Sequence, residues 1–354
     1  MAVYSSSILQ RVFAQLQAAN TPRTIPNSSG TWTNTGSILT RHAACSFTSN
    51  RPVSSMPYKT GNRSSPTGIQ GRTNGTFTWS GPLIPSGAAG TAPDLGEVFF
   101  KSIFGQAGVV VASTSVTYSY LDSGVYPIML SMFDRSGGSS PTNLVAVGCI
   151  PQRVVLTFGG EYLMMSIDGK CVGIMSSTEF SSYTGNDAVL KAGLTSFPTE
   201  PSSGGPVTVT GSPIPGFGGT ATFASTVMPE LRGTYSITIN TGFDYMEDAY
   251  QDGYPFAITA GRRSVFLSSL RFLNSDQAGL NTLKVDGFTK TAFDAVIAHN
   301  TGTAGAIVTA TLKSIQLPAS KLVENGNFID CTFGDAETHA SAVGNTDNLS
   351  IAFT

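Results

Sequence analysis

Hydrophobic and polar residues alternate with a two-residue period along much of the chain, and this pattern predicts β-strands. The alternation is clearest at 234–240 and 348–354, where every second residue is aromatic or aliphatic. Further strands are predicted at 44–49, 73–80, 264–273, 306–317 and 327–333, and as two strands around Asp122-Ser123-Gly124 within 115–134.

A three-stranded meander is predicted between Cys149 and Ser177. Its apolar runs are separated first by Gly159-Gly160-Glu161 and then by Asp168-Gly169. An Asp-Gly pair favours a two-residue hairpin, so we interpret both separators as turns. Such turns set the register, because a slip of one residue would exchange the two faces of each strand.

A short helix is predicted from Thr91 to Gly105. Pro93 lies in its first turn, where a missing N–H costs no hydrogen bond, and Asp94 lies near the positive end of the helix dipole. Gly105 suits the left-handed position that follows many helices. The stripe that we expect to be buried consists of Leu95, Val98, Phe99 and Ile103.

Two further helices follow from spacings of three and four residues. The first is a short amphipathic helix near the N-terminus, and the second surrounds Thr289–His299. The apolar positions that define them are Ile8, Leu9, Val12, Phe13 and Leu16, and then Phe288, Ala292, Phe293, Val296 and Ile297.

Proline and glycine divide the chain into an N-terminal arm at 1–29, a first domain at 30–195, a Pro/Gly/Ser-rich linker or arm at 196–220 and a second domain at 221–354. The N-terminal arm either packs on its own domain or reaches a neighbouring subunit. The order strand, helix, strands occurs in both halves with little sequence identity between them, which is weak support for a duplication.

Charged residues make up only 12% of the 354 residues, and the formal net charge is −2. So few charges suggest a surface that is largely covered by other subunits. No basic face large enough to grip phosphates is implied, which argues against tight nucleic-acid binding. We find no signal peptide, and the apolar runs are too short for a transmembrane helix.

The four cysteines, Cys45, Cys149, Cys171 and Cys331, form no C-x-x-C pair and have no histidine at zinc-ligand spacing. We interpret them as reduced, buried thiols. Cys149 and Cys171 flank the meander and could lie close together, so a bridge between them stays open.

Candidate catalytic residues are few. We interpret His42, His299 and His339 as structural, because a lone imidazole rarely works without partners. The predicted helix would place His299 at its C-terminus, where a charged imidazole interacts favourably with the dipole. Arg262-Arg263 is interpreted as a solvated strand end.

Two loops have residues that could form a ligand site. The acidic loop 243–255 does not fit the spacing of an EF-hand, so we interpret it as solvated or as contacting a neighbouring subunit. The segment 216–221, GFGGTA, lacks the βαβ context of a phosphate loop and is interpreted as linker. The carboxylates of the acidic loop are Asp244, Glu247, Asp248 and Asp252.

The G-x-S-x-G, H-E-x-x-H and Walker A motifs do not occur in the chain. We therefore expect no enzyme, no catalytic, cofactor-binding or metal-binding residues, and no cofactor.

The segments 75–105, 116–134 and 144–174 together resemble bacteriophage tail tube proteins. The family has a Tyr-containing strand, a glycine before a core strand and a glycine-turned hairpin. Residues at those places are Tyr118, Gly148, Gly160 and Gly169. The resemblance covers about residues 40–195 well and 220–354 more loosely.

This resemblance implies a mainly β protein with short helices, built from two tandem tail-tube-type β-sandwich or barrel domains, each with a flanking α-helix. It implies a virion protein, made in the host cytoplasm, whose homotrimers form pseudo-hexameric rings that stack into the tail tube. Implied partners are further copies of the chain and the tail terminator, tape measure and tail-tip proteins. DNA would pass through the lumen during ejection without sequence-specific binding, and no membrane is involved.

Three other functions remain as alternatives. Another virion component, such as a tail terminator, a tail completion protein or a capsid decoration protein, would also be β-rich without catalytic motifs. A carbohydrate-binding β-sandwich module would need an exposed aromatic platform, and Trp32 and Trp79 are the only tryptophans. A hydrolase with an unusual site is the third. Polymerisation separates a tail terminator from a tube protein, because a tube protein forms long tubes whereas a terminator stops at one ring.

Overall fold

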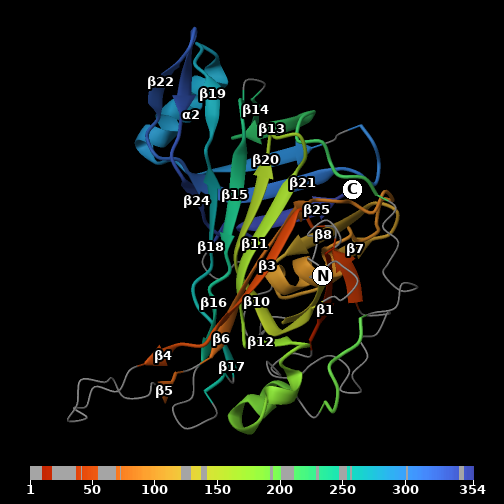
Figure 1. The fold of residues 1–354 in the computed structure, drawn as a ribbon. Coiled ribbons are helices and arrows are strands. Elements are labelled where there is room, and N and C mark those ends of the chain that lie inside the picture. Colours follow the sequence, from red (N-terminus) through yellow and green to blue (C-terminus); the bar gives the residue numbers. More distant parts are fainter. Residues whose placement is uncertain are drawn as a thin grey trace, which may run out of the picture.

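Antiparallel strands make up most of the protein, and the predicted mainly β class is confirmed (Figure 1). The structure, a computed structural model, describes residues 10–17, 37–40, 42–54, 69–71, 73–120, 129–136, 142–191, 194–200, 211–228, 231–246, 253–255, 257–299, 302–342 and 347–354.

The longest sheet, called here the long sheet, has the strand order β3–β6–β11–β10–β15–β18. Because β15 pairs directly with β10, strands from both halves of the chain share this sheet. The strands predicted at 44–49, 73–80 and 234–240 are confirmed. The bounds are β3 Ala44–Asn50, β6 Asn74–Pro82, β11 Met164–Cys171, β10 Asn143–Phe158, β15 Tyr235–Asn240 and β18 Ser264–Ser268.

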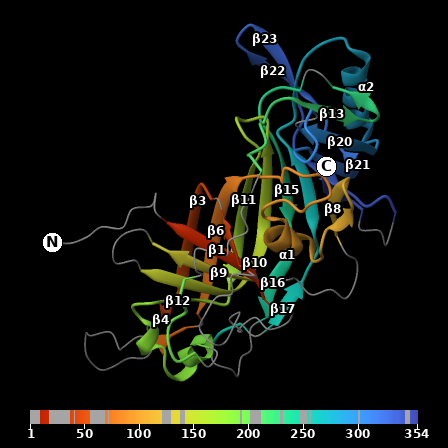
Figure 2. The same ribbon diagram turned by 90° about the vertical axis from the view of Figure 1, so that its right-hand side faces the viewer.

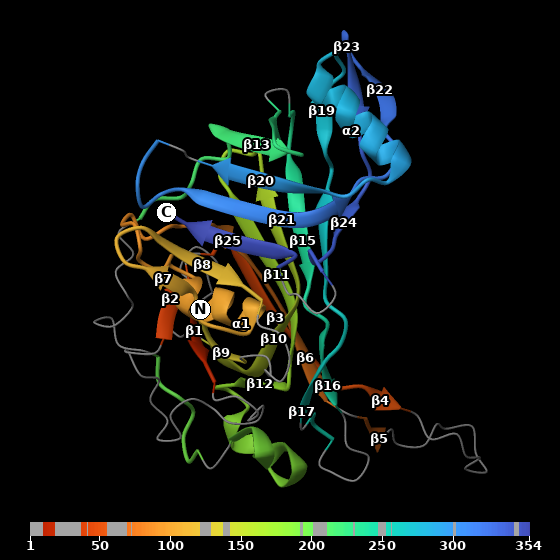
Figure 3. The same cartoon turned by 180° about the vertical axis from the view of Figure 1, so that it is seen from behind.

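A second sheet packs across the first, and Figure 3 shows its strands crossing those of the long sheet at a steep angle. Its order is β7–β8–β25–β21–β20–β13–β14, and the short β24 pairs with both β18 and β21 and so connects the two sheets. The bounds are β7 Val109–Val111, β8 Ser115–Ser119, β25 Leu349–Phe353, β21 Val308–Gln316, β20 Phe293–His299, β13 Gly219–Phe223, β14 Thr226–Val227 and β24 Ala336–Thr338.

Strand β10 belongs to two sheets. Its C-terminal half lies in the long sheet, and its N-terminal half pairs with β9 and β12 in a smaller sheet that also holds β1 and β2. Gly148 marks the change, with a φ of 61° that a residue with a Cβ adopts only under strain. The bounds are β1 Arg11–Leu16, β2 Ser37–Thr40, β9 Leu130–Arg135 and β12 Gly173–Ser176.

The helix predicted at 91–105 is confirmed in position but is shorter. A π-helical turn, η2 (Gly96–Phe100), leads into α1 (Lys101–Phe104), and Gly105 takes the left-handed conformation expected of it. The predicted stripe is buried. Aromatic rings from both sheets surround this helix: the Phe99 ring centroid lies 5.0 Å from that of Trp79 in the long sheet, and the Phe100 ring centroid lies 5.1 Å from that of Tyr118 in the second sheet.

The remaining elements lie around the two main sheets. A small unit, called here the satellite, combines α2 with the sheet β19–β23–β22 and stands at the top of Figure 1. The bounds are α2 Ala278–Thr289, β19 Arg271–Leu273, β23 Phe328–Thr332 and β22 Lys321–Asn325, then β4 Val53–Ser54, β5 Ile69–Gln70, β16 Phe243–Met246, β17 Ala257–Ala260, η3 Phe180–Ser182 and η4 Gly185–Lys191.

The predicted N-terminal amphipathic helix is wrong over its described part, because residues 11–16 form strand β1. β1 lies between β2 and β9. Val12, Phe13 and Ala14 are buried in succession because both faces of β1 are covered: Val12 and Ala14 pack in one buried cluster and Phe13 in another. A spacing of four residues is also an even number, so Val12 and Leu16 share one face of a strand as well as one face of a helix.

The predicted helix around Thr289–His299 is also wrong. The helix α2 ends at Thr289, and residues 293–299 form strand β20 between β13 and β21. Phe288 and Val296 are exposed instead of buried. The residues Phe293, Ala295 and Ile297 are buried by two-residue alternation, which the helical interpretation overlooked.

The meander is confirmed only at its first turn. β10 and β11 pair across Gly159-Gly160-Glu161, but β11 runs straight through the predicted turn at Asp168-Gly169, and β12 pairs with β10. Gly169 is needed for a different reason: a Cβ there would collide with the Phe77 ring and the Ile150 carbonyl oxygen. A glycine is therefore required at this position because the Phe77 ring and the β10 backbone lie so close to it inside the sheet.

The predicted strand at 264–273 is divided in two. Ser269, with a φ of 63°, separates β18 from β19 and directs the chain from the long sheet into the satellite. The strand at the C-terminus is confirmed as β25, with Leu349, Ile351 and Phe353 buried.

The domain boundaries at 195 and 221 stay a prediction. Within the described residues, β10 pairs with β15 and β8 pairs with β25, so hydrogen bonds between strands cross from the first half of the chain to the second in both main sheets. One cluster of buried residues likewise contains Trp79 from the first half and Ile297 from the second.

Candidate functional site

The outward surface of the long sheet carries a dense array of hydroxyl side chains, and we call it the hydroxyl face. Strand alternation produces it: in β6, Phe77 and Trp79 point into the core while Thr76 and Thr78 are exposed. Its hydroxyl residues are Ser46, Thr48, Thr76, Thr78, Ser80, Thr157, Ser166, Ser236, Thr238, Ser264 and Ser268.

The strand register lines these side chains up in rows across the sheet. In one row Ser80 lies opposite Ser166, and Ser166 lies opposite Val155. The row continues through Thr238 to Phe266. In the neighbouring row, the Ser46 and Thr78 hydroxyl oxygens are hydrogen-bonded at 2.7 Å. The result is a mostly polar surface that extends from β3 to β18 and is interrupted by Val155 and Phe266.

Four charged side chains on the hydroxyl face and its rim form two pairs of opposite sign. An Arg153 nitrogen is 3.6 Å from an Asp168 oxygen, and Lys170 Nζ donates a hydrogen bond of 2.8 Å to Asp244 Oδ1. Although partial burial disfavours the Asp244 carboxylate, the hydrogen bonds from Lys170 and the Tyr245 N–H lower the pKa of Asp244 below its ordinary value. Such exposed pairs contribute little stability, but they leave the surface nearly neutral.

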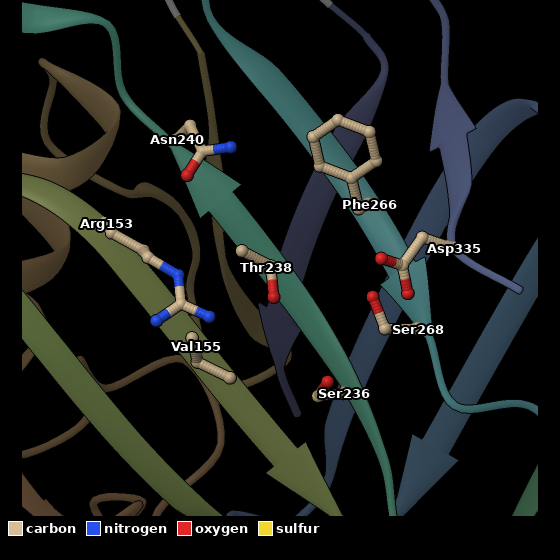
Figure 4. Close-up of a pocket in the computed structure, with 8 residues that line it drawn as sticks. All are labelled: Arg153, Val155, Ser236, Thr238, Asn240, Phe266, Ser268 and Asp335. Carbon is tan, nitrogen blue, oxygen red and sulfur yellow. The ribbon is translucent and has the colours of Figure 1, made fainter.

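A hollow of about 430 Å³ lies on this face where β10, β15 and β18 run side by side (Figure 4). Arg153 stands at one side and Asp335 at the other, with hydroxyl groups and the Asn240 amide between them. Phe266 and Val155 supply its only apolar side chains among the described residues. An open trough of this kind suits contact with a hydrated polar surface rather than enclosure of a small substrate.

The structure keeps the three histidines apart. His42 precedes β3, and its Nδ1 lies 3.3 Å from the Thr40 carbonyl oxygen. His339 follows β24, and its backbone N–H donates a hydrogen bond to the Lys313 carbonyl oxygen. The prediction that His299 lies at a helix C-terminus is wrong, because it ends strand β20 and is buried. Burial lowers the pKa of His299 to about 4, so its imidazole is neutral.

Part of the acidic loop lies within the described residues: Asp244 is in β16, whereas Glu247, Asp248 and Asp252 lie outside the described residues. Within the described ranges, no three His, Cys, Asp or Glu side chains gather where they could hold a metal ion. Arg262 pairs with Glu337, and the Arg263 guanidinium lies 3.5 Å from the centre of the Tyr120 ring, so Arg263 is more than a solvated strand end.

Cys149 and Cys171 do lie close together, with their Sγ atoms 3.1 Å apart between β10 and β11, and both are free. Burial in apolar surroundings raises the pKa of the Cys149 thiol. Cys45 is only half-buried, unlike the other three.

The interpretation of GFGGTA at 216–221 as linker is wrong for its last three residues, which belong to strand β13. The segment also lines a second hollow of about 510 Å³. At its base, the Tyr235 hydroxyl is hydrogen-bonded to His299 Nε2 at 2.7 Å. We call this second hollow the glycine-rimmed pocket. Its described lining comprises Gly159, Gly216, Phe217, Gly218, Gly219, Thr220, Ala221, Val227, Met228, Leu231, Gly233, Tyr235 and His299.

The sequence carries a signal for the hydroxyl face. Ser and Thr alternate with apolar residues at 76–80 and again at 236–240, in two strands that the sequence predicts. These two strands are more than a hundred residues apart in the sequence. The alternation alone does not show that their hydroxyls lie on the same side of one sheet.

No family model matches the chain, and no curated protein matches it. Among solved structures, a Pseudomonas aeruginosa FadL homologue aligns over 97% of this chain and 88% of its own, at 8% identity and a TM-score of 0.09. A TM-score this low carries no information about the fold or the function of the chain.

Within the part of the chain that is described, no helix has both the length and the apolar character needed to cross a membrane.

Proposed function

We propose that the protein is a structural component of a phage virion that polymerises as stacked rings into a tail tube, through which DNA passes during ejection. The observation that carries this proposal is the hydroxyl face, which is broad, nearly neutral and free of large apolar patches. A lumen wall needs these properties, because a polyanion must move along it without being held by phosphate contacts.

The long sheet offers one open edge at β3, whereas its other edge strand, β18, already pairs with β24 at Phe266 and Leu267. Among the described strands, β3 pairs only with β6 and leaves its other side open. An open edge of seven residues is a hazard in a monomer, and closure of strands from several copies into one wall removes it. The tail tube resemblance of the sequence points to the same kind of assembly.

The dimensions favour a trimeric ring. Three copies that each contribute the six strands of the long sheet would give a wall of 18 strands. At about 4.8 Å between strands and a tilt of about 40°, the wall is roughly 36 Å in diameter, which leaves a channel of roughly 25 Å inside the side chains. This is wide enough for a DNA duplex, whereas six copies would leave a far wider lumen.

Negative-stain electron microscopy of the purified protein across a concentration series tests the proposal. We expect stacked rings or hollow tubes with threefold or pseudo-sixfold end views. Single closed rings that never stack would instead support a tail terminator or decoration protein. A monomer at every concentration would contradict the tube function.

A second prediction concerns which sheet lines the lumen. Thr238→Cys places a thiol on the hydroxyl face, and Thr311→Cys places one on the outward face of the second sheet. In assembled tubes, we expect a small maleimide to label both variants and a maleimide on a polymer wider than the lumen to label only Thr311→Cys. The reverse pattern would mean that the second sheet forms the lumen wall.

Labelling of the same two variants before assembly provides the control. Both thiols should then react with both reagents, because Thr238 and Thr311 are outward-facing positions of the free chain. The wild-type protein measures the background from Cys45, the one native cysteine that is not fully buried.

A further inference from the structure

One edge of the second sheet is an exposed apolar strand. In β7 the side chains of Val109, Val110 and Val111 are 60%, 58% and 52% exposed, and β7 pairs only with β8 among the described strands. Exposed edge strands are normally protected by charges, prolines or bulges. Three consecutive valines provide no such protection, so this edge is suited to pairing with another chain.

The opposite edge of the same sheet carries the glycine-rimmed pocket. Phe217 and Val227 stand at its rim with 73% and 56% of their surface exposed. The described residues that line the pocket include no Asp, Glu, Lys or Arg, so the pocket is uncharged like β7. The sheet ends with β7 on one side and with β14, the partner of β13, on the other, and Figure 3 shows β7 and β13 far apart in this series of strands.

The base of the pocket presents an unused hydrogen-bonding atom. His299 is 95% buried, and its Nδ1 has no hydrogen-bond partner among the described residues. A Cβ on Gly219 would lie only 3.0 Å from this Nδ1, so a side chain at this position would crowd the imidazole. A buried polar atom without a partner is costly, and an occupant that supplies a hydrogen bond would remove that cost.

We propose that the β7 edge of one copy docks in the glycine-rimmed pocket of the next copy, so that the second sheet continues from subunit to subunit. This inference rests on the proposed tube function and names the contact that holds one ring together. The occupant is a second copy because both uncharged surfaces belong to one sheet, at its two opposite edges. Such a contact is heterologous, and repetition of it gives a ring when the rotation from copy to copy closes and an open filament when it does not.

The β7–β8 hairpin has the chemistry that the pocket requires. Its valines match the apolar rim formed by Phe217 and Val227, and its open edge offers backbone N–H and C=O groups. Ser113 and Thr114 at its tip add two hydroxyls, of which Thr114 Oγ1 donates to the Ala112 carbonyl oxygen. The satellite also exposes apolar residues, but its strands β19, β22 and β23 form a separate sheet and are not an edge of the second sheet.

Cross-linking tests the contact directly. We expect a mixture of the single variants Val110→Cys and Val227→Cys, oxidised with diamide, to give disulfide-linked dimers on a non-reducing gel. Diamide accepts the two electrons and two protons that the thiols release. Because each chain carries only one new thiol, a mixed dimer reports a contact between copies. Each variant alone measures the background, and a mixture with no more dimer than this background would overturn the proposal.

A charge on β7 tests whether assembly needs the contact. Val110→Glu is expected to abolish rings and tubes, because it buries a carboxylate in an uncharged pocket, and Val110→Thr, which keeps the shape, is expected to retain them. The matched control is Val285→Glu on α2, where the valine is 59% exposed but lies outside the contact. Val110→Glu should remain folded, since its side chain already faces solvent in the free chain.

The outcomes separate the two proposals. If wild-type tubes form and Val110→Glu tubes form as readily as those of Val285→Glu, the contact is overturned and the tube function stands. If the wild-type protein forms no rings, the tube function fails, and the cross-linking result alone then decides whether copies meet through this pair of edges.

Discussion

Replacement of Trp79 by alanine is expected to lower the free energy of unfolding by about 3–5 kcal/mol, the range for removal of a large buried aromatic side chain. Trp79 lies in β6 with 1% of its surface exposed, and its ring centroid is 5.0 Å from that of Phe99 in the buried helical turn. The substitution leaves a cavity between the long sheet and the helix. Urea unfolding followed by circular dichroism measures the loss.

Two variants give this result its control. Thr78→Ala changes the neighbouring residue on the hydroxyl face and should cost no more than about 1 kcal/mol. Trp79→Phe should cost clearly less than Trp79→Ala, because it keeps an aromatic ring against Phe99 and removes an indole N–H that has no partner among the described residues. Similar losses for Trp79→Ala and Thr78→Ala would mean that the sheet faces are assigned the wrong way round.

Acidification from pH 6.5 to pH 4 is expected to lower the free energy of unfolding by about 3 kcal/mol through His299 alone. The unfolded imidazole titrates near 6.5, whereas burial lowers the pKa of the folded one to about 4. Between these values the unfolded chain binds a proton that the folded chain does not. Stability therefore falls as the pH falls through this window and is fully retained above pH 6.5.

The His299→Gln variant isolates this contribution. Carboxylates also titrate at low pH, but they are shared by both proteins, so the difference between the two unfolding curves reports the imidazole. We expect His299→Gln to be less stable than the wild type at pH 7, because it loses the hydrogen bond from Tyr235 and the stacking on Phe158, and to lose less on acidification. A constant difference from pH 7 to pH 4 would contradict a depressed pKa for His299.

Some elements follow from local patterns that tertiary contacts did not override. The strands at 73–80, 234–240 and 348–354 were predicted because burial on one side and solvent on the other impose a two-residue period on any strand of this kind. The buried stripe of the short helix, with Gly105 as its left-handed end, could be predicted for the same reason. Both signals depend only on neighbours in the sequence.

The errors occurred where a short pattern fits two structures. Four-residue spacing in 8–16 fits a helix, but β2 and β9 cover both sides of the chain there and make it a strand. Asp168-Gly169 fits a hairpin turn, but the Phe77 ring packs where a Cβ of residue 169 would lie, and the glycine serves that approach. In each case the partner that decided the conformation lies far away in the sequence.

The sequence by itself determined that this protein is mainly β, weakly charged and without a recognisable catalytic motif, because composition and residue period are properties of the chain alone. Only the tertiary structure decided that the hydroxyls of β6, β11, β10 and β15 form one face, and that the valines of β7 and the glycine-rimmed pocket are opposite edges of one sheet. The physical reason is that alternation states which residues share a face of their own strand, whereas strand order and register, set by long-range pairing and packing, determine which faces and edges meet.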